Sequence, residues 1–155
     1  MAMLKDLNNA FKMKMYLFYK LPGAWFMGVS VKQITAEKAE VYLPYGWRSQ
    51  NPFKSIYFAA QCAAAEFSTG ILCLAAINRR PGISMLVTKF SAEFYKKANT
   101  RCIFTCEQGK EVAALIEKAI TTKEPQVITL ESTGRNEAGE IVSKAWITWS
   151  FKSKL

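Results

Sequence analysis

One carboxylate stands out as a candidate for chemistry. Glu66 is the only charged side chain between Ser55 and Asn78, in an Ala-rich run whose apolar residues predict a helix buried on nearly all sides. A buried carboxylate is paired or functional, and an apolar slot raises its pKa toward the range of a general base or nucleophile. The structural alternative is a salt bridge to a strand cation such as Lys89, and both uses stay open here.

Small side chains share the face of Glu66 on this predicted helix, whereas the opposing stripe is bulky. The small ones are Ser55, Ala59, Cys62, Thr69, Gly70 and Cys73, and the bulky ones are Phe53, Tyr57, Phe67, Ile71 and Leu74. We expect the bulky stripe to pack into a sheet and the small face to turn toward a slot or another chain. Thr69 is a candidate to hold the attacking water or the carboxylate, although a mid-helix Thr often bonds its own backbone carbonyl.

The composition removes several mechanisms. The chain has 155 residues, no histidine and a net charge of +9, which excludes Ser-His-Asp and Cys-His catalysis and most zinc, haem and non-haem iron sites. We therefore predict no metal and no resident cofactor. The four cysteines form no C-x-x-C pair, so they are expected to be buried free thiols in the cytoplasm.

Basic residues gather between positions 79 and 101. They are Arg79, Arg80, Lys89, Lys96, Lys97 and Arg101, against the single acid Glu93. Nucleic acid, an anionic membrane surface or a phosphorylated small molecule would suit such a cluster, and a solvated surface is the ordinary alternative. The interleaved aromatics of an RNA-binding sheet are absent. The apolar run 15–19 is too short for a membrane span.

The elements that must position Glu66 make one α+β domain, 1–155. Helices are expected over 4–20 (ended by Pro22 and Gly23), from Asn51-Pro52 or Ser55 to Asn78, and over 111–122. Strands are expected over 28–35, 39–43, 86–95, 101–107, 126–133 and 141–152, with Gly139 in the last hairpin loop. A long buried helix therefore precedes most of an antiparallel sheet.

This order of elements, with NPFKSIYFAAQCAAAEFSTG at 51–70, resembles the hotdog fold over roughly residues 10 to 152. More closely it resembles the phenylacetyl-CoA-thioesterase-like branch and its uncharacterised relatives, which lack a His-Gly-Gly turn and carry an extra helix like 111–122. In that branch an Asn precedes the turn, and an acid follows nine positions after the His. Asn51 and Glu66 match these two, while Tyr57, Phe58 and Ala59 replace the turn.

The resemblance implies a homodimer or homotetramer in which two sheets join and acyl-CoA binds at the dimer interface. Glu66 would be the general base or nucleophile on the thioester. Backbone N–H groups of Phe58 or Ala59 would polarise its carbonyl, unless the helix already starts at Asn51 and bonds them internally. Asn51 would orient the substrate or Glu66, and its alternative use is a plain N-cap.

The segment from Phe94 to Asn99 resembles the family's aromatic-x-Arg-Pro-Ala element, near which CoA phosphates lie. This resemblance makes Lys96 and Lys97 phosphate partners, with help from Arg101, Arg79 or Arg80; a solvated strand end is the alternative. The sequence thus predicts a cytoplasmic acyl-CoA thioesterase. A non-catalytic acyl-CoA or fatty-acyl binding hotdog protein is the second hypothesis, and a nucleic-acid-binding protein ranks well behind.

Overall fold

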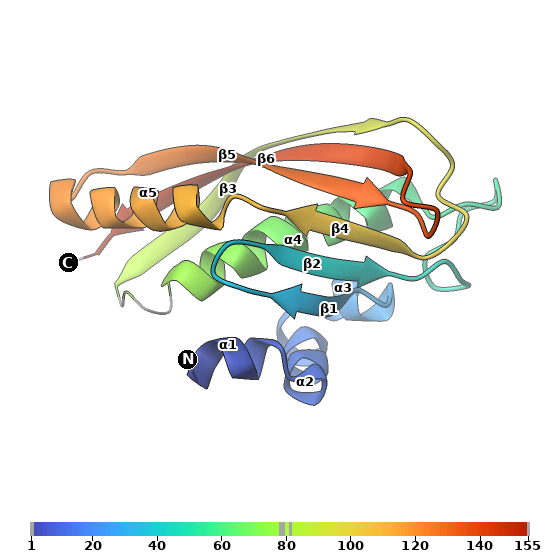
Figure 1. Cartoon of the computed structure of the whole chain (residues 1–155), viewed down its shortest axis with the longest axis horizontal. Coiled ribbons are helices and arrows are strands. Elements are labelled where there is room, and N and C mark those ends of the chain that lie inside the picture. The colour runs from blue at the N-terminus through green and yellow to red at the C-terminus, as the bar shows by residue number, and fades with distance from the viewer. Residues whose placement is uncertain (1, 78–79, 81, 155) are drawn as a thin grey trace.

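A six-stranded antiparallel sheet curves over one long helix (Figure 1). The computed structural model describes residues 2–77, 80 and 82–154. The helices are α1 (Ala2–Leu7), α2 (Ala10–Lys20), α3 (Pro22–Phe26), α4 (Phe58–Ile77) and α5 (Gly109–Thr122). The strands are β1 (Ser30–Ile34), β2 (Ala39–Leu43), β3 (Ile83–Phe94), β4 (Cys102–Cys106), β5 (Gln126–Arg135) and β6 (Ile141–Ser153). The predicted α+β class, with a long helix ahead of most of the sheet, is confirmed.

The strands follow the order β1-β2-β4-β5-β6-β3, and neighbouring strands are antiparallel. Strands β1 and β3 therefore form the two edges. Helix α4 packs against β2, β4, β5 and β6, and α5 packs against α4, β5 and β6 (Figure 1). Helices α1, α2 and α3 lie at the β1 side of the molecule, away from β5 and β6.

Helix α4 forms the core because almost all of its side chains are apolar. Ala64, Ile71 and Leu72 are at most 1% exposed. By length and composition α4 would pass as a membrane span, but 67% of its most apolar window is buried inside the fold. The hydrophobic surface of the helix is therefore buried against the sheet.

The apolar stripe predicted as one helix over 4–20 forms two helices instead. The chain turns at Asn8 and Asn9, and the Asn9 side chain accepts the N–H of Lys12 at 3.0 Å as the N-cap of α2. Helix α2 ends at Lys20, ahead of Pro22, as predicted. Pro22 then opens the short helix α3, where the missing proline N–H removes no helical hydrogen bond.

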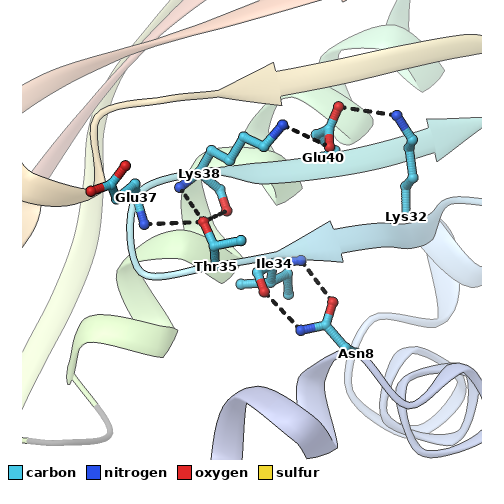
Figure 2. A network of polar contacts seen from close by, with 7 residues as sticks. All are labelled: Asn8, Lys32, Ile34, Thr35, Glu37, Lys38 and Glu40. Atoms are coloured by element: carbon cyan, nitrogen blue, oxygen red, sulfur yellow. Dashed lines mark hydrogen bonds and ion pairs between the residues drawn. The ribbon is translucent and has the colours of Figure 1, made fainter. Parts of the chain in front are cut away.

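Asn8 fastens this helical segment to the edge of the sheet (Figure 2). Its Nδ2 donates to the carbonyl of Ile34 at 2.7 Å, and its Oδ1 accepts the N–H of Ile34 at 2.8 Å. The adjoining turn between β1 and β2 is held by the Thr35 hydroxyl, which accepts the N–H groups of Glu37 and Lys38. The junction of α1 and α2 is thus bound to β1 as a further strand would be.

Helix α4 begins at Phe58, later than the predicted start at Asn51 or Ser55. Asn51 uses its side chain in a turn of its own, because Oδ1 accepts the N–H groups of Phe53 at 2.9 Å and Ser55 at 3.3 Å. Lys54 has a φ of 57° inside this turn, which no helix allows. The predicted helix end at Asn78 lies outside the described residues.

The prediction that a bulky stripe packs into the sheet is correct for the residues within α4 and wrong for those that precede it. Phe67 and Ile71 are 3% and 1% exposed, as expected for residues packed into the sheet. Phe53 and Tyr57 precede the helix and are exposed, so they add nothing to that packing. The reason is the late start of α4, which breaks the helical periodicity on which the stripe was drawn.

The elements after β3 are confirmed with small shifts at their ends. Helix α5 begins at Gly109, two residues before the predicted start. A Cβ at Gly109 would lie 2.2 Å from the carbonyl oxygen of Ala36, so the close approach of α5 to the β1–β2 turn requires glycine. Gly139 has the positive φ predicted for the β5–β6 hairpin loop, 79°.

Candidate active site

Glu66 lies midway along α4, on a half-buried face of the helix. The half-buried positions around it recur at helical spacing: Ala59, Cys62, Ala63 and Glu66. Further along the same face, Gly70 and Cys73 are buried. The small-residue face therefore opens outward, as predicted, but only over its N-terminal half.

The carboxylate of Glu66 lies in an apolar setting. A Cβ on Gly70 would be 3.3 Å from Glu66 Oε1 and equally close to the Trp149 ring, so the carboxylate and the indole flank the same glycine. Burial raises the pKa of Glu66. The pKa of Tyr16 is raised by burial and then by the charge of Glu66, which places the α2 tyrosine on the same side.

Glu66 makes none of the contacts that would neutralise it. Within the described part of the chain, no hydrogen bond or ion pair joins its carboxylate to another group, and the predicted alternative, a salt bridge to Lys89, is not formed. No buried side-chain oxygen of the described residues is left without a partner, so both carboxylate oxygens keep contact with solvent. A water molecule can therefore reach this base.

Thr69 anchors Trp149 rather than a water molecule. Its hydroxyl donates to the backbone carbonyl of Glu66 at 2.9 Å and accepts the indole N–H of Trp149 at 3.0 Å. The side chain is fully buried. The predicted role of holding the attacking water is therefore replaced by its stated alternative, a bond to the helix's own carbonyl.

The cysteines near α4 are poor nucleophiles. All four are free thiols, as predicted. Burial raises the pKa of Cys102 and of Cys106 to about 11, and it also raises the pKa of Cys62, one turn before Glu66. These thiols stay protonated at neutral pH, which leaves the carboxylate as the reactive group of this face.

The start of α4 presents two unused N–H groups. Phe58 and Ala59 stand in the first turn, where a helix supplies no acceptor, and within the described residues neither N–H has one. The next two N–H groups both donate to the carbonyl of Tyr57, at 3.0 and 3.2 Å. Because α4 does not start at Asn51, the Ala59 N–H is not lost inside the helix. These donors at the positive end of a helix dipole suit a developing negative charge.

A groove of about 600 Å³ opens beside this helix start. Its walls are the loop before α4, the first turn of α4 and the chain after β3, and they include Asn51, Phe53, Tyr57, Phe58, Gln61, Phe94, Lys96 and Lys97. Four residues predicted for the site, Asn51, Phe58, Lys96 and Lys97, therefore do meet. Glu66 is absent from the lining, because it stands eight residues beyond Phe58, about 12 Å along a helix.

Asn51 supports the groove as part of its wall. Its Nδ2 donates to the carbonyl of Ile56 at 3.4 Å, while its Oδ1 holds the turn described above. The alternative interpretation as an N-cap of the long helix is wrong, since α4 starts seven residues later. No contact between Asn51 and Glu66 exists among the described residues, so one chain does not bring these two together.

The two lysines of the groove differ in availability. Lys96 Nζ lies 2.5 Å from Glu140, and its hydrogen bond is the main cause of the lowered pKa of that carboxyl. Among the described residues, Lys97 Nζ donates only to the backbone carbonyl of Phe53, at 3.5 Å. Lys97 is therefore the cation that an incoming anion can use without breaking an ion pair.

The arginines predicted to assist them lie elsewhere. Arg80 pairs with Glu117 near the start of β3, whereas Lys96 follows its end, and a strand of this length spans about 40 Å. Arg101 stacks on Tyr42, 4.8 Å from the ring centre, and borders a separate hollow of about 470 Å³. Arg79 lies outside the described residues. These residues were expected to form a cluster because they are close in sequence. An extended strand, however, places the residues at its two ends far apart.

Gln61 is a site residue that the sequence did not single out. It is 5% exposed, its Nε2 donates to the carbonyl of Ile56 at 3.3 Å, and its Oε1 accepts the hydroxyl of Ser143 at 2.9 Å. It thereby ties the first turn of α4 to β6 and to the groove wall. The available signal was a polar side chain in an otherwise apolar helix, uncharged and therefore overlooked beside Glu66.

Solved structures define the class to which this fold belongs. A protein of unknown function from Pseudomonas aeruginosa, described as a probable thioesterase, has a TM-score of 0.81 and 17% identity over 92% of this chain and 95% of its own. A protein of unknown function from Chlorobaculum tepidum gives 0.81 and 17% over 99% of each chain. A thioesterase from Haemophilus influenzae gives 0.67 and 14% over 91% and 90%. At these identities the likeness establishes the hotdog fold, as predicted.

The family follows from the sequence itself. Residues 9–151 match the model of the family described as a domain of unknown function, DUF4442, and the chain belongs to that family. No curated protein matches the chain. The resemblance to hotdog-fold thioesterases is confirmed at the level of the fold, and the phenylacetyl-CoA-thioesterase-like branch stays a prediction.

Proposed function

We propose that this protein is an acyl-CoA thioesterase in which Glu66 acts as general base or nucleophile on the thioester. The observation that carries the proposal is the half-buried, unpaired carboxylate with a raised pKa and open access to water. A base of this kind accepts a proton from water more readily than an exposed carboxylate does. Hotdog-fold neighbours described as thioesterases support the reaction class.

The groove supports the choice of a CoA thioester. Phe58 and Phe94 supply an apolar wall with ring centres 6.2 Å apart, and Lys97 supplies a cation for a phosphate. The N–H groups of Phe58 and Ala59 point to the carbonyl of the bound thioester. CoA is substrate here, and the chemistry asks for no resident cofactor.

One chain cannot assemble this site alone. The N–H groups at the start of α4 and the carboxylate of Glu66 lie about 12 Å apart along the helix, too far to contact one carbonyl group. Strand β3 is a twelve-residue edge strand with exposed Leu86, Phe90 and Phe94. Pairing of two β3 edges about a twofold axis would run the two α4 helices in opposite directions. We propose a homodimer in which Glu66 of one chain faces the helix start of the other.

The experiment is hydrolysis of acyl-CoAs of several chain lengths by the wild type, Glu66→Gln and the exposed control Glu107→Gln. We expect Glu66→Gln to lower kcat by about 10²- to 10⁴-fold and the control to match the wild type. Equal hydrolysis by all three would overturn the role of Glu66. Tight CoA binding without hydrolysis by the wild type would support the second hypothesis, an acyl-CoA binding protein.

A mixing experiment tests whether the site is shared. Ala59→Pro removes one N–H donor at a helix position that tolerates proline, and Glu66→Gln removes the base. Each variant alone should be inactive if both groups act. Co-refolded in equal amounts, half of the dimers carry one intact site, so about a quarter of the wild-type activity returns. No recovery in mixtures shown to contain heterodimers would place both groups in one chain.

The free thiols bear on the compartment. All four cysteines are reduced in the fold, which is the state that proteins keep in the cytoplasm. We propose that the protein is cytoplasmic, because both acyl-CoA hydrolysis and free thiols are compatible with a reducing compartment.

A further inference from the structure

The outer face of α2 is apolar although it faces solvent. Its inner stripe, Met13 and Leu17, is at most 5% exposed and packs on the core. The outer stripe repeats at helical spacing and is exposed: Phe11 at 74%, Met15, Phe18, and Tyr19 at 70%. A surface helix normally carries polar residues there. In a water-soluble fold, an exposed apolar stripe of this kind marks a surface that contacts something other than water.

Aromatic side chains from two other segments extend this stripe. Phe18 contacts the Trp25 ring of α3 with centres 4.9 Å apart, and Phe26 contacts Trp47 at 6.1 Å. Trp47, in the loop after β2, is 78% exposed. We name the aromatic surface from its exposed members: Phe11, Met15, Phe18, Tyr19, Leu21, Phe26 and Trp47.

The same surface is positively charged. No acidic residue occurs from position 7 to position 36, a stretch that carries Lys12, Lys14 and Lys20. Lys14 and Arg48 border a hollow of about 340 Å³ whose walls include Leu17 and Trp25. Within the described part of the chain Lys14, Lys20 and Arg48 have no ion-pair partner, whereas Lys12 pairs with Asp6.

We propose that the aromatic surface docks on an anionic phospholipid bilayer, with α2 lying in the interface. Exposed Trp, Tyr and Phe favour the boundary between headgroups and acyl chains. Basic side chains beside them attract the phosphates of anionic lipids. In this arrangement Lys14 and Arg48 hold headgroup phosphates at the mouth of their hollow.

A second copy of this chain fits the surface less well. Twofold contact sets a patch against itself, so Lys14, Lys20 and Arg48 would meet their own counterparts. Like charges brought together in an interface repel each other and oppose association. Anionic headgroups instead supply the opposite charge and an apolar layer together.

The surface is held in place before any lipid arrives. Asn8 binds the backbone of Ile34 through two hydrogen bonds (Figure 2), and Asn9 caps α2. Docking therefore needs no ordering of the helix, which otherwise opposes binding. The proposal is independent of the reaction at Glu66.

The test is co-sedimentation of the full chain with vesicles of phosphatidylcholine alone or mixed with phosphatidylglycerol. We expect binding to the mixed vesicles that weakens as salt rises. The Phe11→Ser, Trp47→Ser double variant and the Lys14→Glu, Arg48→Glu double variant should each lower the partition coefficient at least about tenfold. The matched controls Val127→Ser and Lys118→Glu, which change exposed residues on β5 and α5, should bind as the wild type does.

A second measurement follows the tryptophan emission of the wild type, so it does not depend on how the two double variants fold. Lipids brominated on their acyl chains should quench tryptophan emission of the wild type, and Trp47→Phe should remove most of that quenching. Absence of binding to mixed vesicles, or binding by both double variants equal to that of the wild type, would overturn the proposal. So would a fall in oligomeric mass of Phe11→Ser, Trp47→Ser without vesicles, since that result assigns the surface to a second copy.

Discussion

Glu66 combines a low-polarity setting with access to water, and the two properties have opposite effects on the fold. Burial favours the protonated acid and raises its pKa, so the ionised form that a base requires is the form that strains the native state. Its apolar neighbours, Gly70 and Trp149, offer no hydrogen bond to offset that cost. The single side chain of Glu66 therefore lowers the stability of the fold and in return supplies a reactive group.

This trade predicts a pH-dependent difference between the wild type and Glu66→Gln. Below the usual pKa of glutamate both folded and unfolded chains carry the proton, and the carboxyl costs nothing. As the pH rises through the raised pKa of folded Glu66, ionisation lowers the free energy of unfolding of the wild type only. We expect the Tm of Glu66→Gln to rise above that of the wild type over the pH range above the usual glutamate pKa of about 4.3. A constant Tm difference across this range would contradict a raised pKa.

Gly70→Ala tests the apolar wall beside the carboxylate. Alanine gains about 1 kcal/mol of helix propensity over glycine, but its Cβ would lie 3.3 Å from both Glu66 Oε1 and the Trp149 ring. We expect the free energy of unfolding to change by less than about 1 kcal/mol while kcat falls at least about tenfold, because the carboxylate is displaced. Gly23→Ala, where a Cβ meets nothing within 4 Å, is the control for both measurements.

Glu66 could be found from sequence because one charge in an apolar helix is a local signal. The role of Thr69 could not, since it depends on Trp149, eighty positions away in the chain. The expected contribution of Arg80 to the phosphate cluster failed for a related reason, although Lys96 and Lys97 do line the groove. Residue types near each other in sequence say little about contact when twelve residues of extended strand lie between them.

At the scale of elements, α1 and α2 are joined to the rest of the fold by the packing of Met13 and Leu17 on the core and by the side chain of Asn8. The two hydrogen bonds of Asn8 replace those that another strand would make with Ile34. Asn8→Ala should lower the free energy of unfolding by about 1–3 kcal/mol, because a part-buried N–H and carbonyl lose their partners. Chemical denaturation measures the loss, and amide exchange at Ile34 should accelerate. Asn99→Ala, at an exposed loop position, should do neither.

Most elements could be predicted because their signals are local. Alternation of side chains predicted β2 and β3, and the glycine of the last hairpin loop took the expected backbone conformation. The start of α4 was missed because Asn51-Pro52 suits a helix start and a tight turn equally well. In the fold, the Ile56 N–H donates to the carbonyl of Ala98 and Gln61 accepts the hydroxyl of Ser143, and these partners lie far away in the sequence.

At the scale of the whole molecule, the sheet has one edge suited to a partner. Phe90→Lys places a charge on the exposed β3 edge and should shift the protein from dimer to monomer in sedimentation velocity. Val127→Lys changes a valine that is 57% exposed on the inner strand β5 and should leave the mass unchanged. A monomeric wild type would contradict the β3 dimer, and with it the shared site.

The hydrogen bonds between Asn8 and β1 limit how many neighbouring chains can pair with the edges of the sheet. A sheet with two open edges can add a neighbour on each side and grow without end, as fibrils do. Here the Asn8 side chain occupies the outward N–H and carbonyl of Ile34, and a register irregularity interrupts β1 between Val31 and Gln33. The β1 edge is therefore less open to another strand than the β3 edge, and we expect assembly through the sheet to end at the proposed dimer. Loss of Asn8 would free the N–H and carbonyl of Ile34 to pair with a further chain.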